Sequence, residues 1–226
     1  MVNAGGPVDL PWIDEVPAAI MAWYPGQEFG AALADVLVGH SDPGGRLPIT
    51  FPTSMDQTPT AGSVPGDGTI LQYSEGLFIG HRWYSANDVS PALPFGHGLS
   101  YTEFRIDEPV VGRNAGRNTE RARVVEVPVT NVGERSGKCV LQAYLQPEPQ
   151  QPEPQQPGSG DRPRVLAGFA AVRLQPGEAT TVAIELSEHT FRAWNTQDQR
   201  WEPLAGNHRL EIATSATEVV HTVTIT

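Results

Sequence analysis

The sequence predicts an α+β chain in two parts: a partial α/β segment, then an all-β sandwich of the immunoglobulin or fibronectin III-like kind. Residues 1–58 contain one strand–turn–helix pattern, and residues 105–226 contain seven short apolar runs separated by Gly, Pro and Asn turns. The 226 residues include 23 glycines and 21 prolines, a content that favours strands and loops over a helical bundle. We expect residues 59–104 to link the two parts.

The first part, residues 1–58, has the pattern of the end of an α/β domain. Ala18–Tyr24 is a continuous apolar run whose length fits a strand buried on both faces, although a short helix would give the same pattern. Gln27–Val38 follows as a predicted helix that ends at Gly39. Because one strand and one helix cannot bury their own apolar faces, we expect this segment to belong to a larger domain and to expose apolar surface when alone.

The linking segment, residues 59–104, holds the candidates for acid–base chemistry. Tyr73–Tyr84 is dense in aromatic side chains, for which packing between the two parts is a simpler interpretation than contact with a ligand. Glu75 is a candidate acid, and His81 and His97 are candidate bases, but no paired carboxylate or metal-ligand spacing accompanies them. His97 stands between two glycines, which favours a hinge residue whose polar groups bond to the backbone.

The second part, residues 105–226, is predicted to be the β-sandwich. Gln146–Pro157 interrupts it with repeated Gln-Pro-Glu-Pro-Gln, and its proline density favours a mobile polyproline II spacer. Cys139 lies among apolar residues and is expected to be a small buried hydrophobe. The predicted strands are Val124–Val129, Val140–Leu145, Val165–Leu174, Thr181–Leu186, Phe191–Trp194, His208–Ala213 and Val219–Ile225.

The composition excludes several classes of function. A formal net charge of −11 disfavours nucleic acid and anionic membranes as partners and is compatible with a neutral ligand such as a sugar. A single cysteine excludes an internal disulfide and a cysteine-rich metal site, and we expect no metal and no cofactor. No apolar run approaches the roughly 18 residues that a membrane span requires, and the first residues lack the features of a signal peptide. The sequence therefore leaves localisation open.

Five motifs follow one another along the chain. They are Asn3–Val8 with Pro11-Trp12, Trp23–Leu37, Gly45–Pro52, Tyr73–Tyr84 and Pro94–Phe104. In this order they resemble the NAGxPVxMPW, WYPGQExGxAxADVL, GxLPxTFP, YxEGxxxGYRxY and PFGxGLSYTxF signatures of glycoside hydrolase family 3, the β-glucosidase-type enzymes. Arg164–Phe169 and Leu174–Glu178 are similar to the fibronectin type III-like domain of that family. The departures are His81 for the usual tyrosine, Gly44 for the usual serine and Phe29 for a common glycine.

The resemblance implies the C-terminal portion of a retaining glycosidase. Residues 1–58 would be the end of its three-layer α/β sandwich domain, and residues 105–226 its fibronectin type III-like domain. Such enzymes use two carboxylates about 5 Å apart, a nucleophile and an acid/base. In the family the nucleophilic aspartate lies in an N-terminal barrel and the acid/base glutamate lies ahead of the NAGxPV segment, so the resemblance implies that both precede Met1.

The same resemblance assigns no catalytic residue to this chain. Glu28 and Glu75 match positions of the motifs that are not catalytic, so the chain alone is expected to be inactive. The complete enzyme would act on a β-linked glucoside or oligosaccharide, and a separate chain carrying the barrel is an expected partner.

A stand-alone carbohydrate-binding or interaction module built on the sandwich is the alternative. Trp194 or Trp201 would then be a stacking platform, although tryptophans in such sandwiches belong more often to the core. The α/β segment argues against this alternative, because a free-standing binding module has no use for it. Retained binding to immobilised glucan would favour it.

Overall fold

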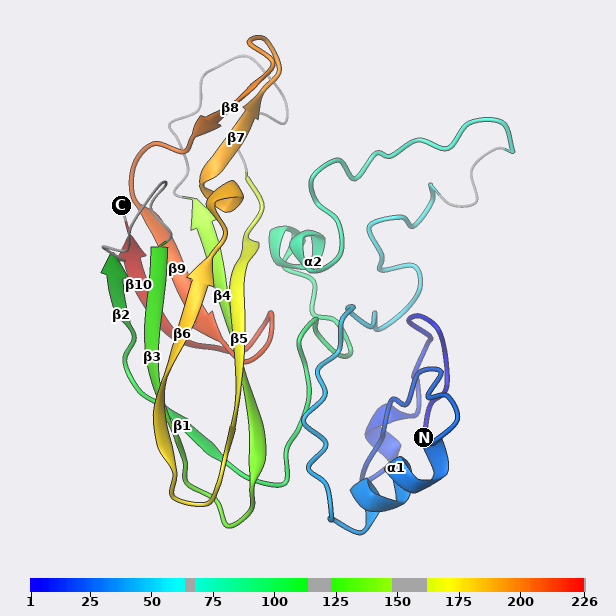
Figure 1. Cartoon of the computed structure of the whole chain (residues 1–226). Coiled ribbons are helices and arrows are strands. Elements are labelled where there is room, and N and C mark those ends of the chain that lie inside the picture. The colour runs from blue at the N-terminus through cyan, green and yellow to red at the C-terminus, as the bar shows by residue number, and fades with distance from the viewer. Residues whose placement is uncertain (64–67, 114–122, 148–161, 226) are drawn as a thin grey trace. The chain divides into compact units, whose positions relative to one another are not determined.

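The computed structural model describes residues 1–63, 68–113, 123–147 and 162–225 and forms two compact units, Met1–Leu99 and Ser100–Thr226 (Figure 1). In the described part of the chain the first unit carries the two α-helices, and the second is built of strands. The prediction of a partial α/β segment followed by a β-sandwich is therefore confirmed. Residues 148–157 of the proline-rich stretch lie outside the described residues, as do residues 64–67 of the preceding linking segment.

The first unit has a small core. Leu10, Leu47 and Phe51 are buried, and half-buried side chains such as Trp12 and Trp23 pack against them. The predicted helix is present as α1 and carries no buried residue. The unit's helical elements are η1 (Ile13–Glu15), α1 (Phe29–Leu37) and α2 (His81–Asn87).

Ala18–Tyr24 is not a strand buried on both faces, and that prediction is wrong. The segment makes one isolated parallel bridge, between Val2 and Met21. Val2 N–H donates to the Ile20 carbonyl at 2.8 Å, and Ala22 N–H donates to the Val2 carbonyl at 2.9 Å. A strand interior to a sheet needs a hydrogen-bonded neighbour on each side, and among the described residues this segment has one neighbour of minimal length.

The second unit is a sandwich of two four-stranded sheets (Figure 1). One sheet has β3 at its centre, with β6 along one edge and the short strands β1 and β2 successively along the other. The second sheet has the order β10-β9-β4-β5. The strands are β1 (Phe104–Ile106), β2 (Val110–Arg113), β3 (Arg123–Asn131), β4 (Gly137–Pro147), β5 (Val165–Leu174), β6 (Ala179–Leu186), β9 (His208–Ala213) and β10 (Val219–Ile225).

The core of the second unit lies between its two sheets. Alternate residues of β3 and β4 point inward, because successive side chains of a strand lie on opposite faces. Val125, Val127 and Val129 are fully buried, and Leu141 meets them from the other sheet. Cys139 is buried in the same core, as predicted.

The predicted strand Phe191–Trp194 does not join either four-stranded sheet. A short 3₁₀ helix, η2 (Glu188–Phe191), precedes β7 (Arg192–Asn195), which pairs with β8 (Arg200–Pro203) in a separate two-stranded sheet. This hairpin extends beyond one end of the sandwich (Figure 1). Its consequence is that the two tryptophans of the hairpin lie outside the core.

Candidate functional site

The first unit brings two of the sequence motifs together as neighbouring backbones. Leu47 N–H donates to the His97 carbonyl and Gly96 N–H donates to the Leu47 carbonyl, both at 2.8 Å. Four residues along, Phe51 and Leu93 form an antiparallel bridge. The Gly45–Pro52 and Pro94–Phe104 motifs, which are more than 40 residues apart in the sequence, are therefore paired in the fold.

A glycine is required where these two motifs meet. A Cβ on Gly98 would lie far inside van der Waals contact with the carbonyl oxygen of Gly45. The Arg46 side chain also lies beside Gly98, and its Nη1 donates a hydrogen bond to the Gly98 carbonyl at 2.6 Å. Close approach of the two backbones therefore explains why the second glycine of the motif, Gly98, has no side chain.

The two candidate bases, His81 and His97, contact the Pro94–Phe104 motif or belong to it. The His81 ring, at the start of α2, stacks on Phe95 with a centroid distance of 5.0 Å and an interplanar angle of 24°. His97 has its backbone N–H bonded to the Pro94 carbonyl at 3.1 Å, and its own carbonyl accepts from Leu47. The backbone groups of His97 are thus hydrogen-bonded, and its role as a hinge residue stays a prediction.

Glu28 and Glu75 lie in separate local structures. Glu28 is the exposed N-cap of α1 and makes no side-chain cap hydrogen bond. Glu75 is half-buried in a turn in which Phe78 N–H donates to the Glu75 carbonyl at 2.9 Å. Among the described residues neither carboxylate forms a hydrogen bond or ion pair with another side chain, so the structure does not bring them together as an acid–base pair.

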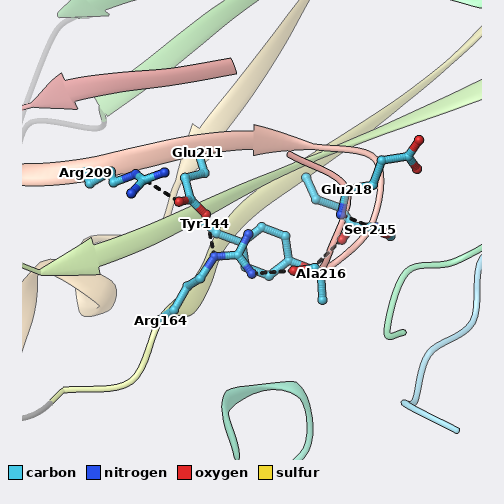
Figure 2. Close-up of polar contacts among 8 residues, drawn as sticks. Tyr144, Arg164, Arg209, Glu211, Ser215, Ala216 and Glu218 are labelled. Carbon is cyan, nitrogen blue, oxygen red and sulfur yellow. Dashed lines mark hydrogen bonds and ion pairs between the residues drawn. The ribbon is translucent and has the colours of Figure 1, made fainter. Parts of the chain in front are cut away.

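A buried polar cluster lies on the outer face of β4 in the second unit (Figure 2). Tyr144 and Gln142 are on that face, and the Tyr144 hydroxyl donates to Gln142 Oε1 at 2.5 Å. Arg164 covers them, with its guanidinium carbon 3.9 Å from the centre of the Tyr144 ring. Burial raises the pKa of the Tyr144 hydroxyl well above its usual range, against a smaller lowering effect of Arg164.

Arg164 joins three segments of the second unit. Its Nε donates to Glu211 Oε2 on β9 at 2.5 Å, and its Nη1 donates to the Ala216 carbonyl in the following turn at 2.7 Å. Arg209 holds the other oxygen of Glu211, Oε1, at 3.0 Å. Because both carboxylate oxygens are engaged by arginines, Glu211 serves as an internal counter-ion rather than an acid or base.

Trp194 and Trp201 are directly opposite each other on the β7–β8 hairpin. Their ring centroids are 5.6 Å apart at an interplanar angle of 67°, an edge-to-face arrangement. They are 49% and 50% exposed, so the interpretation of these tryptophans as core residues is wrong. Sequence reasoning had no signal for this, because exposure depends on the hairpin leaving the sandwich.

The described ranges contain neither a candidate metal site nor a helix that could span a membrane. No group of three or more His, Cys, Asp or Glu side chains there could hold a metal ion. Neither helix there has the length and apolar character needed to cross a membrane.

Each of the two units matches a known domain family. Residues 1–101 match the glycosyl hydrolase family 3 C-terminal domain, and residues 139–216 match a fibronectin type III-like domain. The thermostable β-glucosidase B of Acetivibrio thermocellus is 38% identical over 222 residues, which are 96% of this chain and 28% of that protein. The β-glucosidase BoGH3A of Bacteroides ovatus is 33% identical over 99% of this chain and 30% of its own length.

Solved structures agree with these matches. DesR, a β-glucosidase from Streptomyces venezuelae in complex with D-glucose, superposes with a TM-score of 0.88 at 35% identity, over 99% of this chain and 28% of DesR. β-Glucosidase 3B from Thermotoga neapolitana in complex with glucose gives a TM-score of 0.84 at 32% identity, over 99% of this chain and 30% of that protein.

An α/β piece followed by a fibronectin type III-like sandwich is thus the architecture of the C-terminal portion of a glycoside hydrolase. The chain belongs to glycosyl hydrolase family 3 and corresponds to the C-terminal portion of its β-glucosidases. It spans less than a third of the length of the relatives it matches.

Proposed function

We propose that this chain is the C-terminal portion of a retaining β-glucosidase and hydrolyses β-linked glucosides only together with polypeptide that supplies both catalytic carboxylates. One observation carries the proposal. The chain aligns over 96% of its length with the Acetivibrio thermocellus β-glucosidase, yet covers 28% of that enzyme. The larger share of the relative has no counterpart here and offers room for a barrel with its own carboxylates.

The surroundings of the chain's own carboxylates support this proposal. A retaining glycosidase needs two carboxyl groups about 5 Å apart, one of which must donate a proton near neutral pH. Glu28 is exposed on a helix start and Glu75 is in a turn with no side-chain partner in the described region. Glu211, which is buried, is paired with two arginines. None of the three has the environment of a catalytic pair.

The role of the chain within the complete enzyme is then to form scaffold. The paired motifs Gly45–Pro52 and Pro94–Phe104 fix the shape of the first unit, and the sandwich follows directly from the second of them. In this proposal the polypeptide with the two catalytic carboxylates belongs either to the same translated product or to a separate chain. Either source would supply the nucleophile and the acid/base.

The test is a chimera in which this chain replaces the matching region of the Acetivibrio thermocellus β-glucosidase B. We expect the isolated chain to leave an aryl β-glucoside intact and the chimera to hydrolyse it. Glu28→Gln and Glu75→Gln chimeras are matched controls, and we expect them to keep most of that activity. Hydrolysis by the isolated chain that Glu75→Gln abolishes would contradict the proposal, as would a folded chimera without activity.

The alternative, a stand-alone carbohydrate-binding or interaction module, is favoured by one observation. The hairpin tryptophans are half-exposed instead of belonging to the core. Glucan binding by the isolated chain, combined with a folded but inactive chimera, would support this alternative over the enzyme portion.

A further inference from the structure

The β7–β8 hairpin has two faces of different chemistry. Residues that alternate along its paired strands place Arg192, Trp194, Trp201 and Pro203 on one face, which we call the tryptophan face. Ala193, Asn195, Arg200 and Glu202 occupy the other. The hairpin is therefore an amphipathic element that stands apart from both four-stranded sheets.

The charged groups of the hairpin are already paired. On the polar face, Arg200 Nη2 lies 2.8 Å from Glu202 Oε1 and 3.2 Å from Asp198 Oδ2. On the tryptophan face, the one charged side chain, Arg192, forms an ion pair with Glu188. A charged ligand would have to break one of these pairs, so the tryptophan face suits a neutral ligand.

The tryptophan face also offers hydrogen-bond donors and flat apolar area. Neither Trp194 nor Trp201 donates its indole N–H to any described residue, although buried indoles usually find a partner. The His189 ring meets the Trp201 ring edge-on at 6.1 Å and holds it in place. Half-exposed rings whose N–H groups bond to no described residue match a ligand that combines apolar C–H faces with hydroxyl groups.

We propose that the tryptophan face binds a β-glucan chain, with sugar rings stacked on Trp194 and Trp201. A neutral polysaccharide provides the C–H faces and hydroxyl groups that this surface accommodates, and no charge to oppose the acidic chain, whose net charge is −11. The choice of β-linked glucan over other neutral sugars rests on the proposed function. The surface would hold polymeric substrate independently of the bond-breaking carboxylates.

The test measures binding by the intact chain without hydrolysis. Native gels containing soluble β-1,3-glucan or hydroxyethyl cellulose should retard the wild-type chain, whereas gels containing the α-linked polymer dextran should not. We expect Trp194→Ala and Trp201→Ala each to weaken binding by roughly tenfold, the loss of one stacking contact. Trp194→Phe and Trp201→Phe should retain part of the retardation, because a smaller ring still stacks.

Phe169→Ala is the matched control, because Phe169 is an aromatic residue that is 67% exposed on β5 and not on the hairpin. It should bind glucan as the wild type does. Thermal unfolding of every variant separates loss of the hairpin from loss of binding, since the Phe variants should melt like the wild type.

Three results would overturn the proposal: no retardation of the wild type, equal retardation of wild type and tryptophan variants, or equal retardation in dextran. Concentration-dependent dimerisation that the tryptophan substitutions abolish, without glucan retardation, would assign the face to a second copy instead. The isolated chain can fail to bind glucan while the chimera hydrolyses glucosides, and it can bind glucan while the chimera is inactive. Failure of this proposal is therefore distinguishable from failure of the proposed function.

Discussion

The hydroxyl of Thr102 donates to the amide oxygen of Asn131 at 2.7 Å in the interior of the second unit. Thr102 belongs to the Pro94–Phe104 motif, and Asn131 is the last residue of β3. The same amide oxygen accepts from Gly133 N–H at 3.1 Å, and the amide nitrogen donates to the Arg135 and Leu174 carbonyls at 2.7 and 3.0 Å. Through Thr102, the Pro94–Phe104 motif thus contributes one of the hydrogen bonds that satisfy the buried side-chain amide of Asn131.

Replacing Asn131 by Ala should destabilise the second unit by roughly 2–4 kcal/mol, because it leaves the partners of a buried amide without hydrogen bonds. Asn207→Ala, at an exposed position of the same unit, is the control and should stay within about 0.5 kcal/mol of wild type. Urea unfolding followed by circular dichroism measures both. Equal midpoints for the two variants would show that the Asn131 network contributes little.

Replacing Arg164 by Met should cost about 3 kcal/mol of unfolding free energy, because Glu211 then keeps a single cationic partner in a buried position. The double substitution Arg164→Met with Glu211→Leu should recover most of this loss, since apolar residues of similar size replace the pair.

The exposed pair of Arg105 and Asp107 provides the control for this cycle. Arg105→Ala should cost less than about 1 kcal/mol, because exposed ion pairs are screened by solvent. A single Arg164→Met variant as stable as wild type would refute the structural role of the cluster.

Gly168→Ala should destabilise the sandwich by roughly 1–3 kcal/mol through overpacking. A Cβ at Gly168 on β5 would collide with the Glu185 carbonyl oxygen and lie 3.1 Å from Ile184 Cγ2 on β6. Gly112→Ala on β2 is the matched control, because its Cβ would meet nothing nearer than the Val124 carbonyl oxygen at 3.8 Å. Thermal melting of the two variants should differ, and coincident curves would contradict the close approach of β5 and β6.

Stability should fall as the pH rises above the ordinary tyrosine pKa of 10.0. Burial raises the pKa of Tyr84 and of Tyr144, so the folded state keeps both phenols protonated while the unfolded state ionises them. The stabilisation is complete below the unfolded pKa and is lost as the pH rises through the folded values. Melting temperatures between about pH 9 and pH 11 measure this loss, which Tyr84→Phe should reduce in the first unit. A melting temperature that stays constant over this range would contradict the prediction.

Limited proteolysis should remove the first unit before the second. Among the described residues, the core cluster of the second unit contains sixteen buried residues and that of the first unit contains three. Side chains such as Leu37, Tyr73 and Leu77 are 63%, 78% and 64% exposed in the first unit, which also predicts aggregation of that half. We expect a protease-resistant fragment beginning near Ser100, identified by mass spectrometry. Survival of residues 1–99 with digestion of the sandwich would contradict this.

The sequence alone predicted the long strands because their patterns are local. Val165–Leu174, His208–Ala213 and Val219–Ile225 coincide with β5, β9 and β10, since each is an apolar run of strand length between turn residues. Three- and four-residue strands such as β1, β2 and β8 were missed, because a segment of that length is too short to show the alternation of apolar and polar residues that predicts a strand. Helix α2 was missed for a similar reason: it begins at His81 after Gly80 at φ 52° and has no apolar stripe.

The five motifs and their order along the chain indicated the family, because each motif can be identified from the sequence without knowing which residues it contacts. The tertiary structure alone decided which distant residues meet. Arg164 and Glu211 are separated by 46 residues of chain, and no periodicity in either segment encodes their contact. Likewise, only the departure of β7 from the sandwich turned Trp194 and Trp201 outward, because burial is a property of the packed layers and not of the residue.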